Sequence, residues 1–171
     1  MNPRRRTILI AALLLSLQSL AGAGVRGQQP SAPSAVNSFY RFHLSHNMDF
    51  NARNIQLRRR WLTPEFYQLL LNKIKRQAAY SKAHPDEIPD YDGDPFTDSQ
   101  EYPDSFQVGL PMASGAVEMI GVTLFWSART SRGRDKRNIT VELTQSSGRW
   151  LINDIINSEG SSLRDEFKKA H

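Results

Sequence analysis

The chain has 171 residues and a formal net charge of +5, from 22 basic and 17 acidic side chains, and it contains no cysteine. The lack of cysteine excludes disulfides, thiol catalysis, thiolate zinc sites and a lipoprotein anchor. Arg4–Arg6 belong to an N-terminal segment that we expect to be removed, and without these three the chain carries 19 basic and 17 acidic residues. The remaining charge is close to neutral, which removes the main support for nucleic acid as a partner.

The first residues are typical of a secretory signal. Arg4–Arg6 precede an apolar run, Ile8–Leu20, and Ala21-Gly22-Ala23 supplies a small-residue cleavage site. Residues 1–23 are therefore predicted to be a signal peptide, with an alternative cut after Gly27. The run is shorter than the roughly 20 residues that span a bilayer. We expect an exported, soluble mature chain without a membrane anchor, located in the periplasm or outside the cell.

The N-terminal half of the mature chain favours helices. Residues 28–34 are polar and proline-rich and are predicted to be a disordered linker, followed by a single domain over residues 35–170. Apolar residues at helical spacing predict a helix over Ala35–Asn47. Asp49–Arg60 is polar and is expected to be irregular. A second helix is predicted from a Thr63 cap to Ala83.

The faces of this second helix are also predicted. Phe66, Leu70 and Ile74 form its apolar stripe, and Lys73 is expected on the opposite, solvated side. After the helix comes an acidic loop, residues 84–105, with eight acids, four prolines and no Lys or Arg. Long loops in compact domains are often functional.

Beyond the loop the apolar pattern changes to alternation. Four strands are predicted, over residues 106–112, 116–128, 136–146 and 150–158. Gly148 suits a tight turn between the last two strands, and residues 130–137 form a basic hairpin tip. Ser161 or Ser162 caps a last helix anchored by Leu163 and Phe167. The order predicts an α+β fold: two N-terminal helices packed on a curved four-stranded antiparallel sheet, with a short C-terminal helix.

Three stretches of the chain together resemble a known family. They are Phe39-Tyr40-x-Phe42, the central segment Asp94–Gln100 and the closing strand Gly148–Ile155. The chain is similar, over Ala35–Phe167, to the bacterial exported family named domain of unknown function 3828, with a nuclear transport factor 2-like (cystatin-like cone) fold. The resemblance implies a curved sheet wrapped on helices with a cavity between them, and it implies no particular activity.

The acidic loop is the first candidate site. Asp90, Asp92, Asp94, Asp98 and Glu101 have the spacing of oxygen ligands in an EF-hand, but Pro95 occupies the position that needs glycine. The pattern therefore does not fit an EF-hand, and a looser calcium site formed by these acids is one alternative, with no other cofactor expected. In the structural alternative, Phe96 fills the core, Asp94 caps a turn and the other acids are solvated.

Asp154 is the second candidate. It shares one face of the last strand with Trp150, Ile152 and Ile156, so that a carboxylate is expected on an apolar face. Such a group could act as the general base of a small cavity enzyme of isomerase or hydrolase type, with a donor such as Tyr40, Tyr67 or Tyr80. The alternatives are an ion pair with an arginine or exposure near the end of the strand.

Two further groups are weaker candidates. His43 and His46 lie three residues apart on the first predicted helix, where two histidines alone do not make a metal site, and one is expected to be buried and one exposed. A basic run, Arg58-Arg59-Arg60-Trp61, and the basic residues of the hairpin could recognise a phosphate-rich or acidic partner, such as a lipid headgroup or an acidic protein patch. Such runs are usually solvated surface.

The charge distribution favours a binding module over an enzyme. Acids gather in the loop and bases on the hairpin, which suits electrostatic complementarity with a partner. We expect an exported, non-enzymatic interaction module whose partner is an envelope protein or a small ligand. The residues predicted to contact it are Asp94, Phe96, Gln100, Arg132, Arg134 and Arg137.

Overall fold

The computed structural model describes residues 30–88, 91–114, 116–127 and 135–169. The predicted signal peptide and three candidate site residues, Asp90, Arg132 and Arg134, lie outside these ranges. The description that follows concerns the remaining chain. Among the helices described, none is both long enough and apolar enough to cross a membrane.

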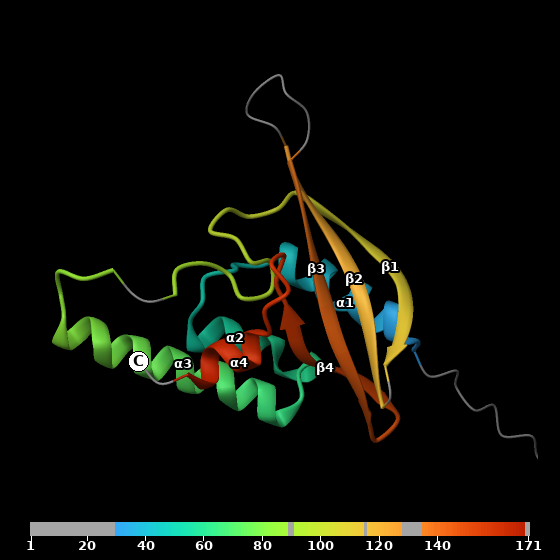
Figure 1. Ribbon diagram of the computed structural model, residues 1–171, viewed down its shortest axis with the longest axis horizontal. Helices are drawn as coiled ribbons and strands as arrows, with labels where there is room; N and C mark the ends of the chain where they lie inside the picture. Colours follow the sequence, from blue (N-terminus) through green and yellow to red (C-terminus); the bar gives the residue numbers. More distant parts are fainter. Residues whose placement is uncertain (1–29, 89–90, 115, 128–134, 170–171) are drawn as a thin grey trace, which may run out of the picture.

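A four-stranded antiparallel sheet forms one layer of the molecule (Figure 1). Its strands follow one another in space as they do in the sequence, β1-β2-β3-β4. Their bounds are β1 Ser105–Ser114, β2 Val117–Trp126, β3 Asp135–Ser146 and β4 Arg149–Ile156. The four predicted strands are therefore confirmed, with ends that differ by at most two residues.

Helices cover one face of this sheet and confirm the α+β prediction. Alternate residues on β2 and β3 point into the core, among them Val122 and Val141, as expected for a sheet with one buried face. Helix α1, Ala32–Leu44, lies against this face (Figure 1). Helix α3, Pro64–Ala83, packs beside β4 and against the short C-terminal α4, Leu163–Lys168.

Side-chain caps set where the helices begin. The hydroxyl oxygens of Ser31, Thr63 and Ser162 each accept a hydrogen bond from the backbone N–H three residues further on. The predicted Thr63 cap and one of the two predicted C-terminal caps are thus confirmed. Helix α1 begins at Ala32, so the last three residues of the predicted linker are helical.

The segment expected to be irregular contains a helix, which is a correction. Helix α2 spans Ala52–Arg58 and continues into a single 3-10 turn, η1, Arg59–Trp61. Asn51 caps α2 through its side chain. The helix contributes few apolar residues, but Ile55 and Arg58 are both buried, so tertiary contacts rather than an apolar stripe stabilise it.

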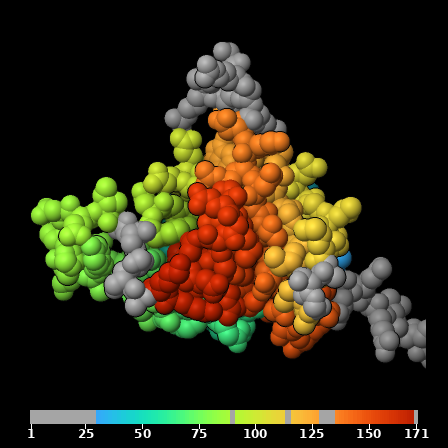
Figure 2. All heavy atoms as spheres, in the orientation of Figure 1, coloured from blue at the N-terminus to red at the C-terminus, as the bar shows by residue number. Residues whose placement is uncertain are grey.

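Lys73 also differs from expectation. It was predicted on the solvated side of α3, yet only 4% of the residue is exposed. Its ammonium lies 5.3 Å from the centre of the Phe167 ring, so α4 covers it and provides a cation–π contact. Figure 2 shows α4 and the end of β4 covering the centre of one face, with the C-terminal half of α3 projecting beside them.

Candidate functional site

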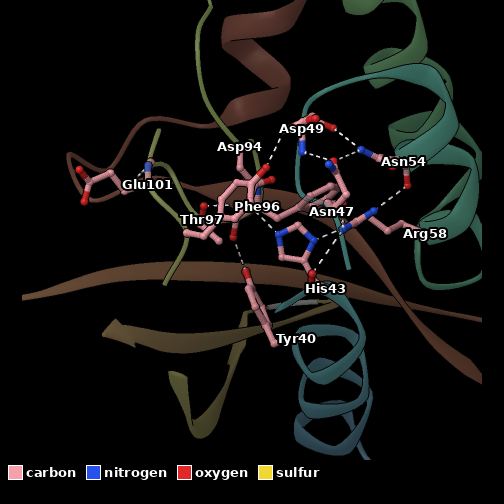
Figure 3. A network of polar contacts seen from close by, with 12 residues as sticks. Tyr40, His43, Asn47, Asp49, Asn54, Arg58, Asp94, Phe96, Thr97 and Glu101 are labelled. Carbon is pink, nitrogen blue, oxygen red and sulfur yellow. Dashed lines mark hydrogen bonds and ion pairs between the residues drawn. The ribbon is translucent and has the colours of Figure 1, made fainter. Parts of the chain in front are cut away.

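Three buried side chains fasten the acidic loop to the helices (Figure 3). The Nε of Arg58 on α2 lies 2.6 Å from Nδ1 of His43 on α1, and Nε2 of that histidine lies 2.6 Å from Oδ2 of Asp94 in the loop. All three residues are at most 3% exposed. We call this Arg58–His43–Asp94 series the buried relay.

The hydrogen bond from Arg58 determines which ring nitrogen of His43 carries the proton. A guanidinium group can only donate hydrogen bonds, so Nδ1 of His43 must accept the one from Arg58. The ring proton is then on Nε2, which donates to the Asp94 carboxylate. A neutral histidine thus joins a cation to an anion, and the relay as a whole carries no net charge.

The remaining donors of Arg58 are also satisfied. They reach the backbone oxygens of Asn54 at 2.8 Å, Asn47 at 2.9 Å and His43 at 3.4 Å. Burial lowers the pKa of Arg58, and the negative charge of Asp94 opposes this shift. Because arginine loses its proton only far above neutral pH, the buried side chain stays charged.

Asp94 and Phe96 therefore have the roles that the structural alternative predicted. The Asp94 carboxylate accepts hydrogen bonds from the Thr97 hydroxyl at 2.7 Å and from the Phe96 N–H at 3.2 Å, which caps the turn. Phe96 is 1% exposed and packs against Phe39. The hydroxyl of Tyr40 donates to the Phe96 carbonyl at 2.7 Å, and burial, reinforced by Asp94, raises the pKa of this tyrosine well above its ordinary value.

The loop fixed in this way forms one wall of a cleft of about 880 Å³. We call it the acidic cleft, because five acids and no Lys or Arg line it; the acids are Asp49, Asp92, Asp94, Glu101 and Asp104. Tyr91 and Tyr102 of the same loop contribute aromatic side chains, and Phe50 and Trp126 lie on its other walls. Concave sites that combine aromatic walls with a few charged groups are typical binding sites.

Hydrogen bonds hold the rim of the acidic cleft. The Tyr102 hydroxyl donates to Asp49 at 2.5 Å, which raises the pKa of the tyrosine and lowers that of the aspartate. The indole N–H of Trp126 on β2 donates to the Glu101 carbonyl at 3.0 Å. The cleft therefore joins four separate parts of the chain, residues 48–50, Gln77, residues 91–104 and residues 126–127, and only its loop residues were among our candidates.

A second cleft, of about 690 Å³, lies beside the first and shares its Asp92, Gln100, Glu101 and Trp126. Lys136 and Arg137 at the base of the basic hairpin line its far side. Arg137 lies 3.5 Å from the Asp98 carboxylate and 5.9 Å from the ring centre of Trp126. The two oppositely charged segments thus meet at one place, and part of their charge is neutralised within the molecule.

The structure distributes the predicted calcium ligands among other partners. Asp92 accepts from the Gln100 amide at 3.0 Å, and Asp98 accepts from the Ser158 hydroxyl at 2.9 Å in addition to its ion pair. Within the described ranges, no three His, Asp or Glu side chains are grouped closely enough to hold a metal ion. A calcium site that includes Asp90 stays a prediction.

Asp154 is a residue of β4, and its carboxylate lies at the N-terminus of α4. The prediction that Asp154 shares a face with Ile152 is wrong, because a bulge makes Asn153 an extra residue on β4. Ile152 and Ile155 pair with the buried Leu143 and Val141, whereas Asp154 pairs with Glu142. The carboxylate accepts from the Ser162 hydroxyl at 2.5 Å, the Arg164 N–H at 3.0 Å and the Ile155 N–H at 2.8 Å. Burial raises its pKa, and these hydrogen bonds oppose the shift.

No observation favours Asp154 as a general base. It lies outside the acidic cleft and outside the second cleft beside it. The hydroxyls of the three tyrosines considered as its donors bind elsewhere in the chain: Tyr40 to Phe96, Tyr67 to Gln56 and Tyr80 to Glu87.

The two histidines separate as expected. His43 is fully buried, whereas His46 is exposed, stacks on Phe42 and lies 2.9 Å from the Ser45 hydroxyl. The burial of Arg58 was not predicted, because the run to which it belongs was interpreted as solvated surface. Arg58 contacts the carbonyl of Asn54, four residues earlier in the sequence. A spacing of four residues does not by itself predict that an arginine is buried.

Comparison with known proteins gives a fold but no family. No protein-family model matches the chain, and no curated protein does. The fold is similar to that of one chain in the crystal structure of the type VI native effector–immunity complex Tae3–Tai3 from Ralstonia pickettii. The TM-score is 0.50 and the identity 21%, over 76% of this chain and 97% of that chain. The resemblance to domain of unknown function 3828 stays a prediction.

Proposed function

We propose that this chain is an exported, non-enzymatic module that binds a partner protein, in the manner of an immunity protein that holds an effector. The acidic cleft carries the proposal, because it is concave, has aromatic walls and is lined, beside the neutralised Asp94, by four further acids without a base. The similarity in fold to a chain of an effector–immunity complex supports a protein as the partner.

The chemistry of the cleft indicates what the partner presents. Carboxylates on a concave wall attract Lys and Arg side chains, and aromatic rings beside them add cation–π contacts with the same groups. Asp92 and Glu101 are exposed, while the buried relay holds the loop from behind. A basic segment of the partner would therefore bind a surface that is already formed, which lowers the entropy cost of binding.

The test is cross-linking capture in the native host, comparing the wild type with Asp92→Lys/Glu101→Lys. We expect the wild type to retain a specific protein and the cleft variant to lose it, because reversing two charges repels a basic segment. Asp86→Lys/Glu159→Lys is the matched control, since it reverses two exposed acids outside the cleft. The same captured proteins at the same yields from all three chains would refute the proposal.

Once identified, the partner allows a direct measurement. Its affinity for the purified wild-type chain, determined by calorimetry at two salt concentrations, should fall at the higher salt, because surface charges are then screened. If the partner is toxic, co-expression of the wild type but not of the cleft variant should restore growth. An affinity that is independent of salt would place the partner on another surface.

A further inference from the structure

At the end of the sheet opposite the acidic cleft, three arginines line a second groove. It has a volume of about 540 Å³ and lies between η1, the start of α3 and the start of β4. Arg59, Arg60 and Arg149 line it, together with the apolar side chains of Leu57, Leu62 and Leu151 and without any acid. We call it the arginine groove.

The guanidinium groups in this groove are already positioned. Arg60 lies 3.9 Å from the ring centre of Trp61, and Arg59 lies 5.4 Å from that of Tyr67. Arg149 donates a hydrogen bond to the Arg60 carbonyl at 2.7 Å, which joins β4 to η1. Rings and backbone therefore restrict side chains that would otherwise lose much conformational freedom on binding.

These contacts leave the positive charge uncompensated. None of the three arginines forms an ion pair with any acid in the described part of the chain. Three like charges in one groove repel one another, and an anion placed among them relieves that repulsion. The planar guanidinium fork matches a carboxylate in two parallel hydrogen bonds, which a lysine does not achieve.

We infer that the arginine groove binds an acidic, leucine-containing segment of a protein. Carboxylates fit the guanidinium groups, and Leu57 and Leu151, which are not buried, suit apolar side chains between those carboxylates. A concave site with apolar walls fits a peptide better than the flat surface of a bilayer. Leu57, which is 48% exposed, marks apolar surface that such a segment would cover.

This inference does not depend on the proposed function, because the two sites lie at opposite ends of β3. The acidic cleft adjoins Trp126, which pairs with Asp135 at the start of β3, whereas Arg149 pairs with Ser146 at its end. At roughly 3.3 Å per residue, the length of this strand places Trp126 and Arg149 up to roughly 35 Å apart. Variants of one site should leave the other unchanged.

The experiment is fluorescence anisotropy with a labelled twelve-residue peptide of alternating Glu and Leu, compared with its Gln and Leu twin. We expect the wild type to bind the acidic peptide, and Arg59→Gln/Arg60→Gln to weaken that binding at least tenfold. Arg53→Gln/Lys75→Gln removes two exposed positive charges elsewhere on α2 and α3 and should bind like the wild type. Asp92→Lys/Glu101→Lys should also bind like the wild type.

A second variant separates charge from geometry. Arg59→Lys/Arg60→Lys keeps both charges and loses the guanidinium fork, so it should weaken binding at least threefold while its melting temperature confirms folding. Equal affinity of the Gln twin, or of the Arg59→Gln/Arg60→Gln variant, would overturn the inference. Binding to phosphatidylglycerol vesicles through these arginines, without binding to the acidic peptide, would overturn it in favour of a membrane surface.

Discussion

Asp94 is the residue on which the attachment of the acidic loop depends. It supplies the negative end of the buried relay and also caps the turn that contains Phe96. Arg58 is 1% exposed and remains charged, so Asp94 is the acid that compensates a cation inside the molecule. The loop and the two helices are therefore coupled through one electrostatic arrangement.

Replacing Asp94 with Asn should strongly destabilise the fold. Removing one member of a buried charge pair leaves the other without compensation, which typically costs about 3–5 kcal/mol. We expect a loss of this size in the free energy of unfolding, measured by urea denaturation. Asp92→Asn is the matched control, because this acid is exposed and surface changes usually stay within about 0.5 kcal/mol. Equal losses in both variants would show that the relay does not stabilise the fold.

Asp154 allows a prediction about pH. Because burial raises its pKa above the ordinary 3.8, the folded state binds more protons than the unfolded state between the two values. Stability from this group is therefore complete at low pH and is lost as the pH rises through the raised pKa. Asp154→Asn removes this dependence while its amide can still accept from Ile155 and Arg164 and donate to Ser162.

The measurement is urea denaturation of the wild type and Asp154→Asn at a series of pH values from about 3.5 to 7. We expect the free energy of unfolding of the wild type, relative to the variant, to fall as the pH rises and then to level off. A difference that stays flat or increases with pH would contradict the raised pKa.

At the scale of elements, the β3–β4 hairpin turn is the clearest case of local sequence setting structure. Ser147 and Gly148 both have positive φ, 48° and 75°, as a two-residue type I′ turn requires. Glycine adopts this conformation without strain, whereas serine does so at a cost. The turn therefore contains one residue that suits it and one that does not.

Two substitutions should shift stability in opposite directions. Gly148→Ala should lower the free energy of unfolding by about 1 kcal/mol, because alanine resists positive φ. Ser147→Asn should raise it by roughly 0.5 kcal/mol, because Asn-Gly is the preferred pair in this turn. Thermal denaturation of both variants beside the wild type provides the measurement. Stabilisation by Gly148→Ala would refute the assigned turn.

The elements that could be predicted from sequence are those with a local cause. The Thr63 cap and the stripe of Phe66 and Leu70 define α3, and alternation of Ile139, Val141 and Leu143 defines β3. Each signal lies within one stretch of chain and repeats with the period of its element. The fold class follows from the order of these stretches.

The missed features have causes that are distant in sequence. Helix α2 is stabilised by the burial of Arg58, which requires His43 and Asp94 from other segments. The acidic cleft likewise needs Asp49 and Trp126 beside the loop. Spacing within a single segment contains no information about such contacts, so a charged run reads as solvated surface although one of its members is buried.

At the scale of the whole molecule, the two edges of the sheet differ. The β4 edge is covered, because Leu62 forms a bridge with Ile152 and Ser162 forms one with Ile156. The β1 edge has no further strand beside it in the described structure, and Leu110 and Met112 on it are 86% and 61% exposed. An open edge of this kind is a surface on which two copies can pair.

Pro111 lies in the open edge, next to a bulge between Val108 and Pro111 that shifts the pairing with β2. Proline offers no N–H to an incoming strand, and a bulge disturbs the straight ladder that such pairing needs. We infer that these two features keep copies of the chain apart. Pro111→Thr restores the missing donor without adding apolar surface, so it should increase self-association.

Light scattering over a range of protein concentrations tests this prediction. We expect Pro111→Thr to form dimers or larger species at concentrations where the wild type does not. Gln107→Thr is the matched control, since it raises strand propensity on the same exposed edge but adds no backbone donor. If both variants associate equally, strand propensity rather than the missing N–H limits pairing. If neither associates, the missing N–H of Pro111 does not limit pairing and the prediction is wrong.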